Sequence, residues 1–324
     1  MSRVRAVQVT RTGGPEVLEV ADLPTPEPGP GEVLVDVAAA GVNFIDIYRR
    51  SGAYPMTTPF VAGSEGAGTV ARLGPGVTHV AVGDRVAWKE APGSYAEQVC
   101  VPVAEVVPVP DAVSDEVAAA TMLQGLTAHY LATSTFPVGK DDWTLVHAAA
   151  GGVGLLLTQI VKLRGGRVLA TTSTEEKADL ARGAGADEVT TYENFADRAR
   201  ELTDGEGFPV VYDGVGKATF ERGLDALRVR GLMVLYGAAS GPVPPFDPQT
   251  LNAKGGLFLT RPSLAHYTRD RAELVDRAEE LFGWIGAGRL DVRIGGRYSL
   301  AEADRAHEDL QGRRTTGKLL ILPR

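Results

Sequence analysis

Cysteine is almost missing from this chain of 324 residues, which contains only Cys100. A single cysteine excludes a disulfide within the chain, and it excludes zinc and iron–sulfur sites that need several thiolates. Cys100 follows an alternating stretch, residues 95–99, and free cysteine usually behaves as a small hydrophobic side chain. We therefore expect Cys100 to be a half-buried strand residue.

Long apolar runs are missing as well. No segment approaches the roughly 18 uninterrupted apolar residues that are needed to cross a bilayer. The N-terminal sequence MSRVRAVQVT alternates like a strand and lacks the apolar core of a signal peptide. Together with the lone thiol, these absences favour a cytoplasmic protein with no membrane partner.

The chain also lacks an excess of positive charge. It carries 33 Lys and Arg residues against 41 Asp and Glu residues, which gives a formal net charge of −8. Electrostatic binding of nucleic acid needs a basic face, so we expect no nucleic-acid partner. The 44% hydrophobic and 23% charged residues are ordinary for a folded protein. The length allows two domains, each with its own core.

Sequence motifs for metal binding and for covalent catalysis are absent too. The five histidines form no pair at helical spacing and have no cysteine nearby, so no metal site is predicted. Residues 63–68 (GSEGAG) resemble the GHExxG segment of zinc alcohol dehydrogenases, but Ser64 stands where those enzymes have the ligand histidine. No GxSxG nucleophile motif occurs. Any redox chemistry would then come from an organic cofactor.

The pattern of apolar residues changes along the chain. Short alternating segments separated by Pro and Gly predict a β-rich barrel or curled sheet in the first part. These candidate strands cover residues 4–9, 17–21, 32–39, 67–73, 84–88 and 95–101. From about residue 123, strand and helix patterns alternate, which predicts a parallel sheet with helices on both faces. The strands are expected at 144–148, 167–172, 188–191, 210–213, 232–236 and 257–260, with helices at 152–163, 174–183, 194–202 and 217–227.

The C-terminal part does not continue this alternation. From about residue 261 it shows two amphipathic helical patterns and a final apolar strand at 318–322. We infer that this tail returns to the first domain. The expected domains are therefore residues 1–122 with 262–324, and residues 123–261.

A turn of small residues follows the strand at 144–148. Ala148, Gly151 and Gly154 have the spacing AxxGxxG, a relative of the GxGxxG fingerprint of dinucleotide-binding proteins. Small residues let the backbone turn tightly, approach a diphosphate and pack the following helix against the strand. The helix N-terminus then offers free N–H groups to the diphosphate. The alternative is a glycine-rich turn without a ligand.

The end of the next strand separates NAD from NADP. NAD sites usually place Asp or Glu there, about 20 residues after the fingerprint, to accept from the ribose 2′-OH. This strand instead ends in TTST, residues 171–174, and Lys177 follows in the first helical turn. Hydroxyls and a lysine suit a 2′-phosphate. Glu175 and Glu176 argue the other way, but acidic residues in a first turn also stabilise the helix dipole. The sequence therefore predicts NADPH.

Several motifs together resemble the zinc-independent, zeta-crystallin-like quinone oxidoreductases of the medium-chain dehydrogenase/reductase superfamily. The resemblance runs over the whole chain. Its landmarks are GVNFID (41–46), SGAYP (51–55), GLT (125–127), AAAGGVG (148–154), YDGVG (212–216) and TRPSL (260–264). It implies an α/β protein with a GroES-like domain and a Rossmann-type doubly wound sheet, an active site in the cleft between them, NADPH as cofactor and a homodimer.

The resemblance also implies roles for individual residues. Asn43 would lie at the nicotinamide, and Tyr48 and Tyr54 would line the acceptor pocket. The expected cofactor contacts are Thr127, Ala149, Gly151, Gly152, Val153, Gly154, Ser173, Lys177, Tyr192, Gly237 and Arg313. The chain departs from the family at Gln124, where many relatives have lysine, and at Gly214, where some have serine.

Simpler interpretations of these residues stay open. Asn43 could serve only as a helix cap, the two tyrosines could pack at a domain edge, and Lys177 and Arg313 could be solvated. The predicted function is hydride transfer from NADPH to a small quinone without zinc. One alternative is an NADPH-dependent enone or enoyl thioester reductase, in which Tyr54 matches a proton-donating tyrosine. The other is an NADPH-binding protein without enzymatic activity.

Overall fold

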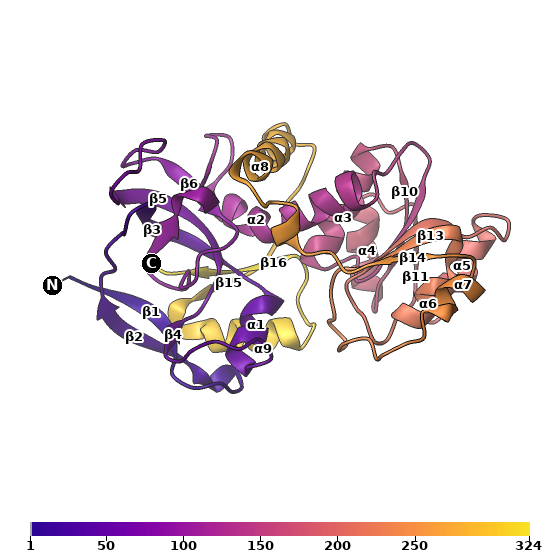
Figure 1. Cartoon of the computed structure of the whole chain (residues 1–324), viewed down its shortest axis with the longest axis horizontal. Coiled ribbons are helices and arrows are strands. Elements are labelled where there is room, and N and C mark those ends of the chain that lie inside the picture. Colours follow the sequence, from indigo (N-terminus) through magenta and orange to yellow (C-terminus); the bar gives the residue numbers. More distant parts are fainter. Residues whose placement is uncertain (1) are drawn as a thin grey trace. The chain divides into compact units, whose positions relative to one another are not determined.

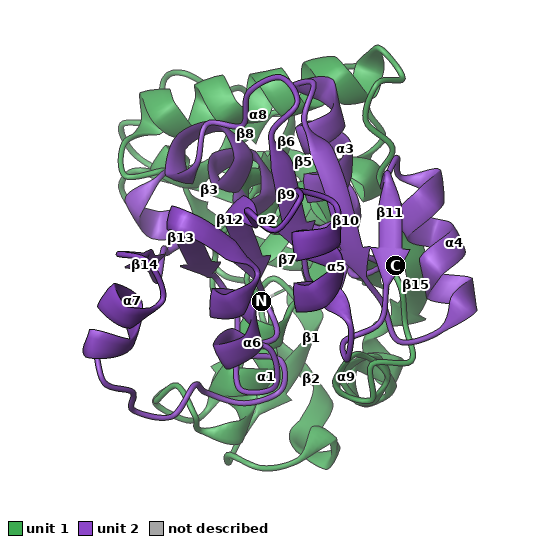
Figure 2. Cartoon of the chain, turned by 90° about the vertical axis from the view of Figure 1, so that its right-hand side faces the viewer, with its two compact units in different colours: residues 1–126, 268–324 green, residues 127–267 purple. Residues whose placement is uncertain are grey.

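The computed structural model describes residues 2–324, and these form two compact units. Unit 1 contains the chain up to Leu126 together with Thr268–Arg324, and unit 2 contains Thr127–Tyr267 (Figure 2). Unit 1 is mostly antiparallel β-structure, and unit 2 is a parallel sheet with helices. Among residues 2–324, no helix combines the length and the apolar character needed to span a membrane.

Unit 1 contains two sheets. The first has three antiparallel strands in the order β2-β1-β4, and the second has seven strands in the order β15-β16-β3-β5-β6-β8, with β7 paired to β3. The strands are β1 (Arg3–Val9), β2 (Leu18–Pro24), β3 (Glu32–Val42), β4 (Phe60–Val61), β5 (Glu65–Leu73), β6 (Arg85–Trp88), β7 (Gln98–Pro102), β8 (Val107–Pro108), β15 (Ile294–Ser299) and β16 (Lys318–Leu322). Because β16 pairs antiparallel with β3, the C-terminal strand belongs to the same sheet as the N-terminal part of the chain.

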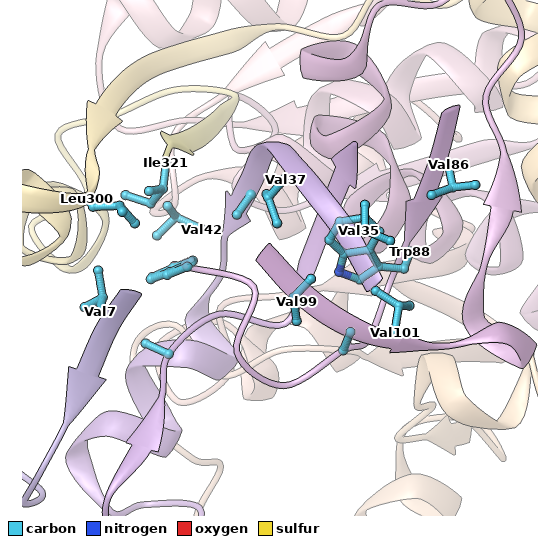
Figure 3. Packing of buried hydrophobic residues seen from close by; sticks show 14 of the residues in the cluster. Val7, Val35, Val37, Val42, Val86, Trp88, Val99, Val101, Leu300 and Ile321 are labelled. Atoms are coloured by element: carbon cyan, nitrogen blue, oxygen red, sulfur yellow. The ribbon is translucent and has the colours of Figure 1, made fainter. Parts of the chain in front are cut away.

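Alternation along the strands of unit 1 sends valines to one side, where they build its core. Figure 3 shows side chains from β1, β3, β6, β7 and β16 meeting there, with Leu300 from a short 3-10 turn. Trp88 is fully buried, and its indole N–H donates to Ser94 Oγ at 2.9 Å, so its one polar atom is satisfied. Cys100 lies half-buried in β7, which confirms the prediction, and burial raises the pKa of its thiol to about 11.

Helices complete unit 1. They are α1 (Phe44–Ser51), α2 (Asp115–Tyr130), α8 (Arg271–Gly286) and α9 (Ala303–Gln311), with short 3-10 turns at Pro15–Val17, Val103–Glu105 and Leu300–Glu302. The division between the units falls inside α2, after Leu126. At the start of α8, the Asp270 side chain accepts the Glu273 N–H at 3.0 Å and caps the helix.

Unit 2 is a six-stranded parallel sheet in the order β11-β10-β9-β12-β13-β14. The strands are β9 (Trp143–Val146), β10 (Arg167–Thr171), β11 (Glu188–Thr190), β12 (Phe208–Asp213), β13 (Leu227–Leu235) and β14 (Phe258–Thr260). Counted along the chain, this is the order 3-2-1-4-5-6 of a Rossmann fold. The order reverses between β9 and β12, and ligands of such sheets bind outside the carboxyl ends of the strands at that point.

Helices cover both faces of this sheet, as the alternating sequence predicts. They are α3 (Gly152–Leu163), α4 (Glu175–Gly183), α5 (Phe195–Glu201), α6 (Phe220–Asp225) and α7 (Gln249–Ala253), with one π turn at Leu131–Thr135 and one 3-10 turn at Leu264–His266. In Figure 1, α3 and α4 lie on one side of the sheet and α5, α6 and α7 on the other. The helix expected at residues 217–227 is shorter in the structure, where α6 begins only at Phe220.

Candidate cofactor and active site

The turn after β9 is shaped by small residues. Ala148 has a left-handed backbone with φ 51°, which is unusual for a residue with a Cβ and concentrates strain at this point. Ala149 N–H donates to Thr171 O of the neighbouring strand at 3.1 Å, and Gly151 N–H returns to Ala148 O at 2.9 Å. The turn is thereby held over the ends of β9 and β10, and Gly151 is the N-cap of α3.

Gly154 is the residue that lets α3 start so close to the turn. A Cβ on Gly154 would lie 2.5 Å from Ala148 O and 2.7 Å from Ala149 Cα, and both are backbone atoms. No side chain can be accommodated without moving the helix. The first N–H groups of a helix have no partners within it, so Gly152, Val153 and Gly154 fit a diphosphate at this end of α3.

The hydroxyl groups of residues 171–174, at the end of β10, differ in whether they already have hydrogen-bond partners in the protein. Thr171 Oγ1 lies 2.8 Å from His147 Nδ1 in the core, and Thr174 Oγ1 accepts the Lys177 backbone N–H at 3.3 Å and caps α4. Ser173 is exposed at the strand end. No carboxylate occurs in residues 171–174, so nothing there would repel a 2′-phosphate.

Tyr192 forms a hydrogen bond with the backbone of the turn. Its hydroxyl oxygen accepts the Ala148 N–H at 3.2 Å. The structure therefore brings Tyr192 together with the small-residue turn, although the two are 44 residues apart in the sequence.

His147 lies beneath the turn and is a core residue. It is completely buried, its ring packs edge-on against Phe195 at 4.6 Å, and burial lowers the pKa of its imidazole to about 4. The neutral ring is stable at neutral pH because a buried imidazolium would be poorly solvated. We assign His147 no part in proton transfer.

The carboxyl ends of β12 and β13 approach each other closely. Asp213 is buried, and its carboxylate accepts the N–H groups of Val215 at 2.7 Å and Gly216 at 2.9 Å. A Cβ on Gly237 would lie 2.6 Å from Gly214 O. A Cβ on Gly214 would meet the ring of Tyr236 at 2.8 Å, which gives a physical reason for glycine in place of serine here.

The predicted acceptor residues lie together in unit 1. The rings of Tyr48 and Tyr54 have centroids 5.4 Å apart, and Tyr54 N–H donates to Tyr48 O at 3.0 Å. Tyr54 is 49% exposed. Asn43 precedes the same helix, α1, and is only 4% exposed. Two tilted aromatic rings at this distance suit a flat, conjugated molecule.

A buried polar network anchors the start of α1. Asp46 Oδ2 accepts from Asn43 N at 3.0 Å and from Tyr95 Oη at 3.1 Å, and Asp46 Oδ1 accepts from Ser64 Oγ at 3.0 Å. Burial raises the pKa of Asp46 to about 6, and these hydrogen bonds oppose the rise. Tyr95 Oη also lies 3.3 Å from His307 Nε2.

Ser64, at the position of the zinc-ligand histidine, has protein partners. Its hydroxyl accepts from Arg49 Nη1 at 2.5 Å and donates to Asp46, and Arg49 also pairs with Glu90 at 2.9 Å. Within residues 2–324, no group of three or more His, Cys, Asp or Glu side chains is arranged to hold a metal ion.

The structure groups the other predicted residues by unit. Thr127 starts unit 2 on α2 and is nearly buried, and Arg313 is exposed after α9 in unit 1, with φ 54°. It stays a prediction that the turn at residues 148–154 is approached by Asn43, Tyr48, Tyr54 and Arg313. Sequence reasoning did not find Asp46, Glu65, Tyr95 and Lys318, which are polar, buried and joined by hydrogen bonds in unit 1.

Comparison with known proteins gives two family matches. The model for the alcohol dehydrogenase GroES-like domain matches residues 29–111, and the model described as zinc-binding dehydrogenase matches residues 152–279. A quinone oxidoreductase from Pseudomonas aeruginosa is 48% identical over 98% of this chain and 99% of its own length. A 2-haloacrylate reductase from Burkholderia is 39% identical over 99% of both chains.

Two solved structures are also similar. A mycobacterial protein complexed with NADPH is 54% identical, with a TM-score of 0.96 over 99% of this chain and 100% of that one. The Escherichia coli quinone oxidoreductase complexed with NADPH is 41% identical, with a TM-score of 0.96 over 98% of this chain and 100% of that one. The fold and the turn define a dinucleotide-binding protein with a GroES-like domain and a Rossmann domain, which confirms the predicted fold class. This chain belongs to the quinone oxidoreductase family of the medium-chain dehydrogenase/reductase superfamily.

Proposed function

We propose that this protein is an NADPH-dependent quinone oxidoreductase that works without zinc. The observation that carries the proposal is the turn at residues 148–154, which leaves no room for a Cβ on Gly154 and is bonded to Tyr192. The full-length similarity to quinone oxidoreductases supports the proposal. Two solved structures that resemble this chain contain NADPH, which supports it further. We also keep a cytoplasmic location in the proposal, because a single cysteine suits a reducing compartment.

The proposal assigns cofactor binding to unit 2. The N–H groups of Gly152, Val153 and Gly154 would hold the diphosphate, assisted by the helix dipole. Ser173, Lys177 and the Tyr192 hydroxyl would hold the 2′-phosphate, and Arg313 of unit 1 would join them. The other cofactor contacts in the proposal are Thr127, Ala149, Gly151 and Gly237.

The acceptor is assigned to residues of unit 1. When bound, NADPH supplies a hydride to an electron-poor acceptor, so no covalent catalyst is required. Asn43 would orient the nicotinamide, and the rings of Tyr48 and Tyr54 would stack against a flat quinone. The proton would come from solvent or from a tyrosine hydroxyl. Orientation and exclusion of water would supply most of the rate increase.

Zinc independence is supported by the partners of Ser64. Its hydroxyl is engaged by a cationic guanidinium and a carboxylate, so neighbouring protein groups already satisfy it. We expect NADPH oxidation with simple quinones to exceed that with enals and enoyl thioesters, and to survive prolonged dialysis against a chelator. The measurement is the decrease in NADPH absorbance across the panel, together with the metal content of the active protein. Loss of activity on dialysis, restored by zinc, would overturn the metal-free mechanism.

A homodimer is part of the proposal. Strand β14 lies at the edge of the sheet of unit 2, and Phe258 on it is 58% exposed. Edge strands have unpaired backbone groups that favour pairing with another chain, and a two-fold axis would bring the same strand of a second copy against it.

The Phe258→Lys variant should be monomeric at micromolar concentration, because each copy would bring a positive charge to the shared edge in place of an apolar ring. Light scattering after size-exclusion chromatography measures the mass. Val82→Lys is the matched control, since Val82 is 62% exposed in unit 1 and should tolerate lysine without a change in mass. A wild-type protein that is already monomeric would refute the dimer.

Enone reduction is the second candidate, because the 2-haloacrylate reductase is 39% identical over nearly the whole chain. Tyr54 is exposed beside Tyr48 and could deliver a proton to a reduced enone. We expect Tyr54→Phe to change kcat for quinones less than threefold, because a reduced quinone can take its protons from water. A loss of about 100-fold, the size of a general-acid contribution, would favour the enone reaction instead. NADPH binding without turnover of any acceptor would favour a non-enzymatic role.

A further inference from the structure

A buried ion pair in unit 1 lies beside Asn43. It joins Glu65, the first residue of β5, to Lys318, the first residue of β16, and their side chains are 0% and 1% exposed. In a buried ion pair, the cost of removing both charges from water offsets much of the electrostatic attraction between them. A protein with well-packed apolar residues at the same two positions is often equally stable. The general stability of the fold therefore does not explain why the pair is present.

The partners of the pair indicate what it does. Lys318 Nζ donates to Asn43 Oδ1 at 2.7 Å, and Asn43 Nδ2 donates to Glu65 Oε2 at 2.8 Å. An ammonium group can only donate and a carboxylate can only accept. If the amide were rotated by half a turn, its NH2 would face the ammonium group and its oxygen would face the carboxylate. The pair thus fixes the Asn43 amide in one orientation.

The same contacts limit what Asn43 can offer to a ligand. Its Nδ2 has two hydrogens, and it donates to Glu65 and, at 3.3 Å, to Gly41 O. Its Oδ1 has two lone pairs, of which Lys318 uses one. The capping box of α1 also turns the Asn43 side chain toward the backbone N–H of Asp46. These contacts leave the amide no freedom to rotate.

Glu65 also reaches helix α2. Its Oε1 accepts the backbone N–H of Leu123 at 2.5 Å. Gly41 provides the space for the pair, since a Cβ there would lie 2.2 Å from Glu65 Oε2 and 2.6 Å from Lys318 Cε. The residues that set the orientation of Asn43 therefore belong to three strands, β3, β5 and β16, and to helix α2. None of them lies on a loop.

We infer that Glu65 and Lys318 are positioning residues, which hold the Asn43 amide in the one orientation in which it would meet the nicotinamide. This inference rests on the proposed function, which assigns Asn43 to the nicotinamide. Rate depends steeply on the orientation of the reacting groups. Disturbing the pair should therefore reduce kcat while the turn in unit 2 still binds the rest of the dinucleotide.

The Lys318→Met variant tests the inference by activity and by binding. We expect kcat to fall between 10-fold and 100-fold. The binding test compares NADPH with 2′-phospho-ADP-ribose, which lacks the nicotinamide, by calorimetry. The dissociation constant of the fragment should change less than twofold, while the advantage of NADPH over the fragment should shrink. A general structural defect would weaken both ligands.

A double-mutant cycle shows whether Lys318 acts through Asn43. If it does, Asn43→Ala combined with Lys318→Met should lose no more kcat than Asn43→Ala alone. Lys89→Met is the control, because Lys89 is also buried and paired in unit 1, with Glu105, but it shares no residue with the Asn43 contacts. It should retain wild-type kcat.

A second variant covers the case in which an unpaired buried Glu65 prevents folding. Glu65→Gln with Lys318→Met removes both charges, and the side-chain amide introduced by Glu65→Gln can then face Asn43 in either sense. The same loss of kcat with unchanged fragment binding is expected. Either variant with kcat within twofold of wild type, multiplicative losses in the cycle, or loss of fragment binding in both variants would overturn the inference. A wild-type protein that fails to bind NADPH or to reduce quinones would instead refute the proposed function itself.

Discussion

Gly154→Ala should lower the affinity for NADPH at least 100-fold and the free energy of unfolding by about 1–3 kcal/mol, the usual cost of overpacking. The added methyl group would lie 2.5 Å from Ala148 O and 2.7 Å from Ala149 Cα, so α3 must move away from the turn. The diphosphate would then lose hydrogen bonds of about 1.5–3 kcal/mol each, and two of them are worth 100-fold or more. Calorimetric titration and denaturant unfolding measure the two effects.

Gly183→Ala is the matched control for this substitution. Gly183 is the last residue of α4, in the same unit, and a Cβ there meets nothing within 4 Å. Alanine favours a helix over glycine by about 1 kcal/mol, so this variant should bind NADPH normally and unfold at the same or higher denaturant concentration. Unchanged NADPH affinity in Gly154→Ala would show that the diphosphate binds elsewhere.

Lys177→Ala should weaken NADPH binding by about 10-fold to 100-fold and NADH binding by less than twofold. The difference corresponds to one charge-assisted hydrogen bond of about 1.5–3 kcal/mol, made only to the 2′-phosphate. The cap of α4 should survive, because Thr174 Oγ1 accepts from the backbone of residue 177 rather than from its side chain. Dissociation constants for both nucleotides, measured on the same preparation, give the comparison.

Glu176→Gln serves as the control for Lys177→Ala, because it removes a neighbouring negative charge from the same helical turn. NADPH affinity should stay the same or rise slightly in this variant. If Lys177→Ala weakened NADPH and NADH by the same factor, the 2′-phosphate would not be bound by Lys177. The choice of NADPH would then have to rest on Ser173, Tyr192 or Arg313.

Local patterns predicted most of unit 2, since each strand there is short, apolar and bounded by turn residues. They failed at residues 217–227, where α6 covers only Phe220–Asp225. Asp213 explains the difference. Its carboxylate binds the N–H groups of Val215 and Gly216 and the Thr219 hydroxyl, and these bonds hold the preceding residues in a turn. The helical pattern of residues 217–227 gives no sign of a buried carboxylate that fixes the residues before it and binds the Thr219 hydroxyl.

Helix α2 was not found in the sequence at all. Its stretch AAATMLQGL, residues 118–126, is nearly apolar all round, so it has no polar face and no helical period to detect. Helices of this kind are buried, and short apolar runs do not separate them from strands. Only its place among the other elements of the fold shows why an unpatterned helix is stable here.

The sequence by itself determined the backbone chemistry of the turn at residues 148–154, the lack of an acidic residue in residues 171–174, the Rossmann alternation and the family. These properties depend on residues close together in the chain, where spacing and side-chain size act directly on the backbone. The tertiary structure alone decided which hydroxyls are hydrogen-bonded within the protein and that Tyr192 binds the Ala148 N–H. It also decided that Lys318 and Glu65, 253 residues apart, pair with each other and bind the Asn43 amide. Such partners are chosen by burial, because a charge removed from water is stable only where the fold brings it an opposite charge and matching hydrogen bonds.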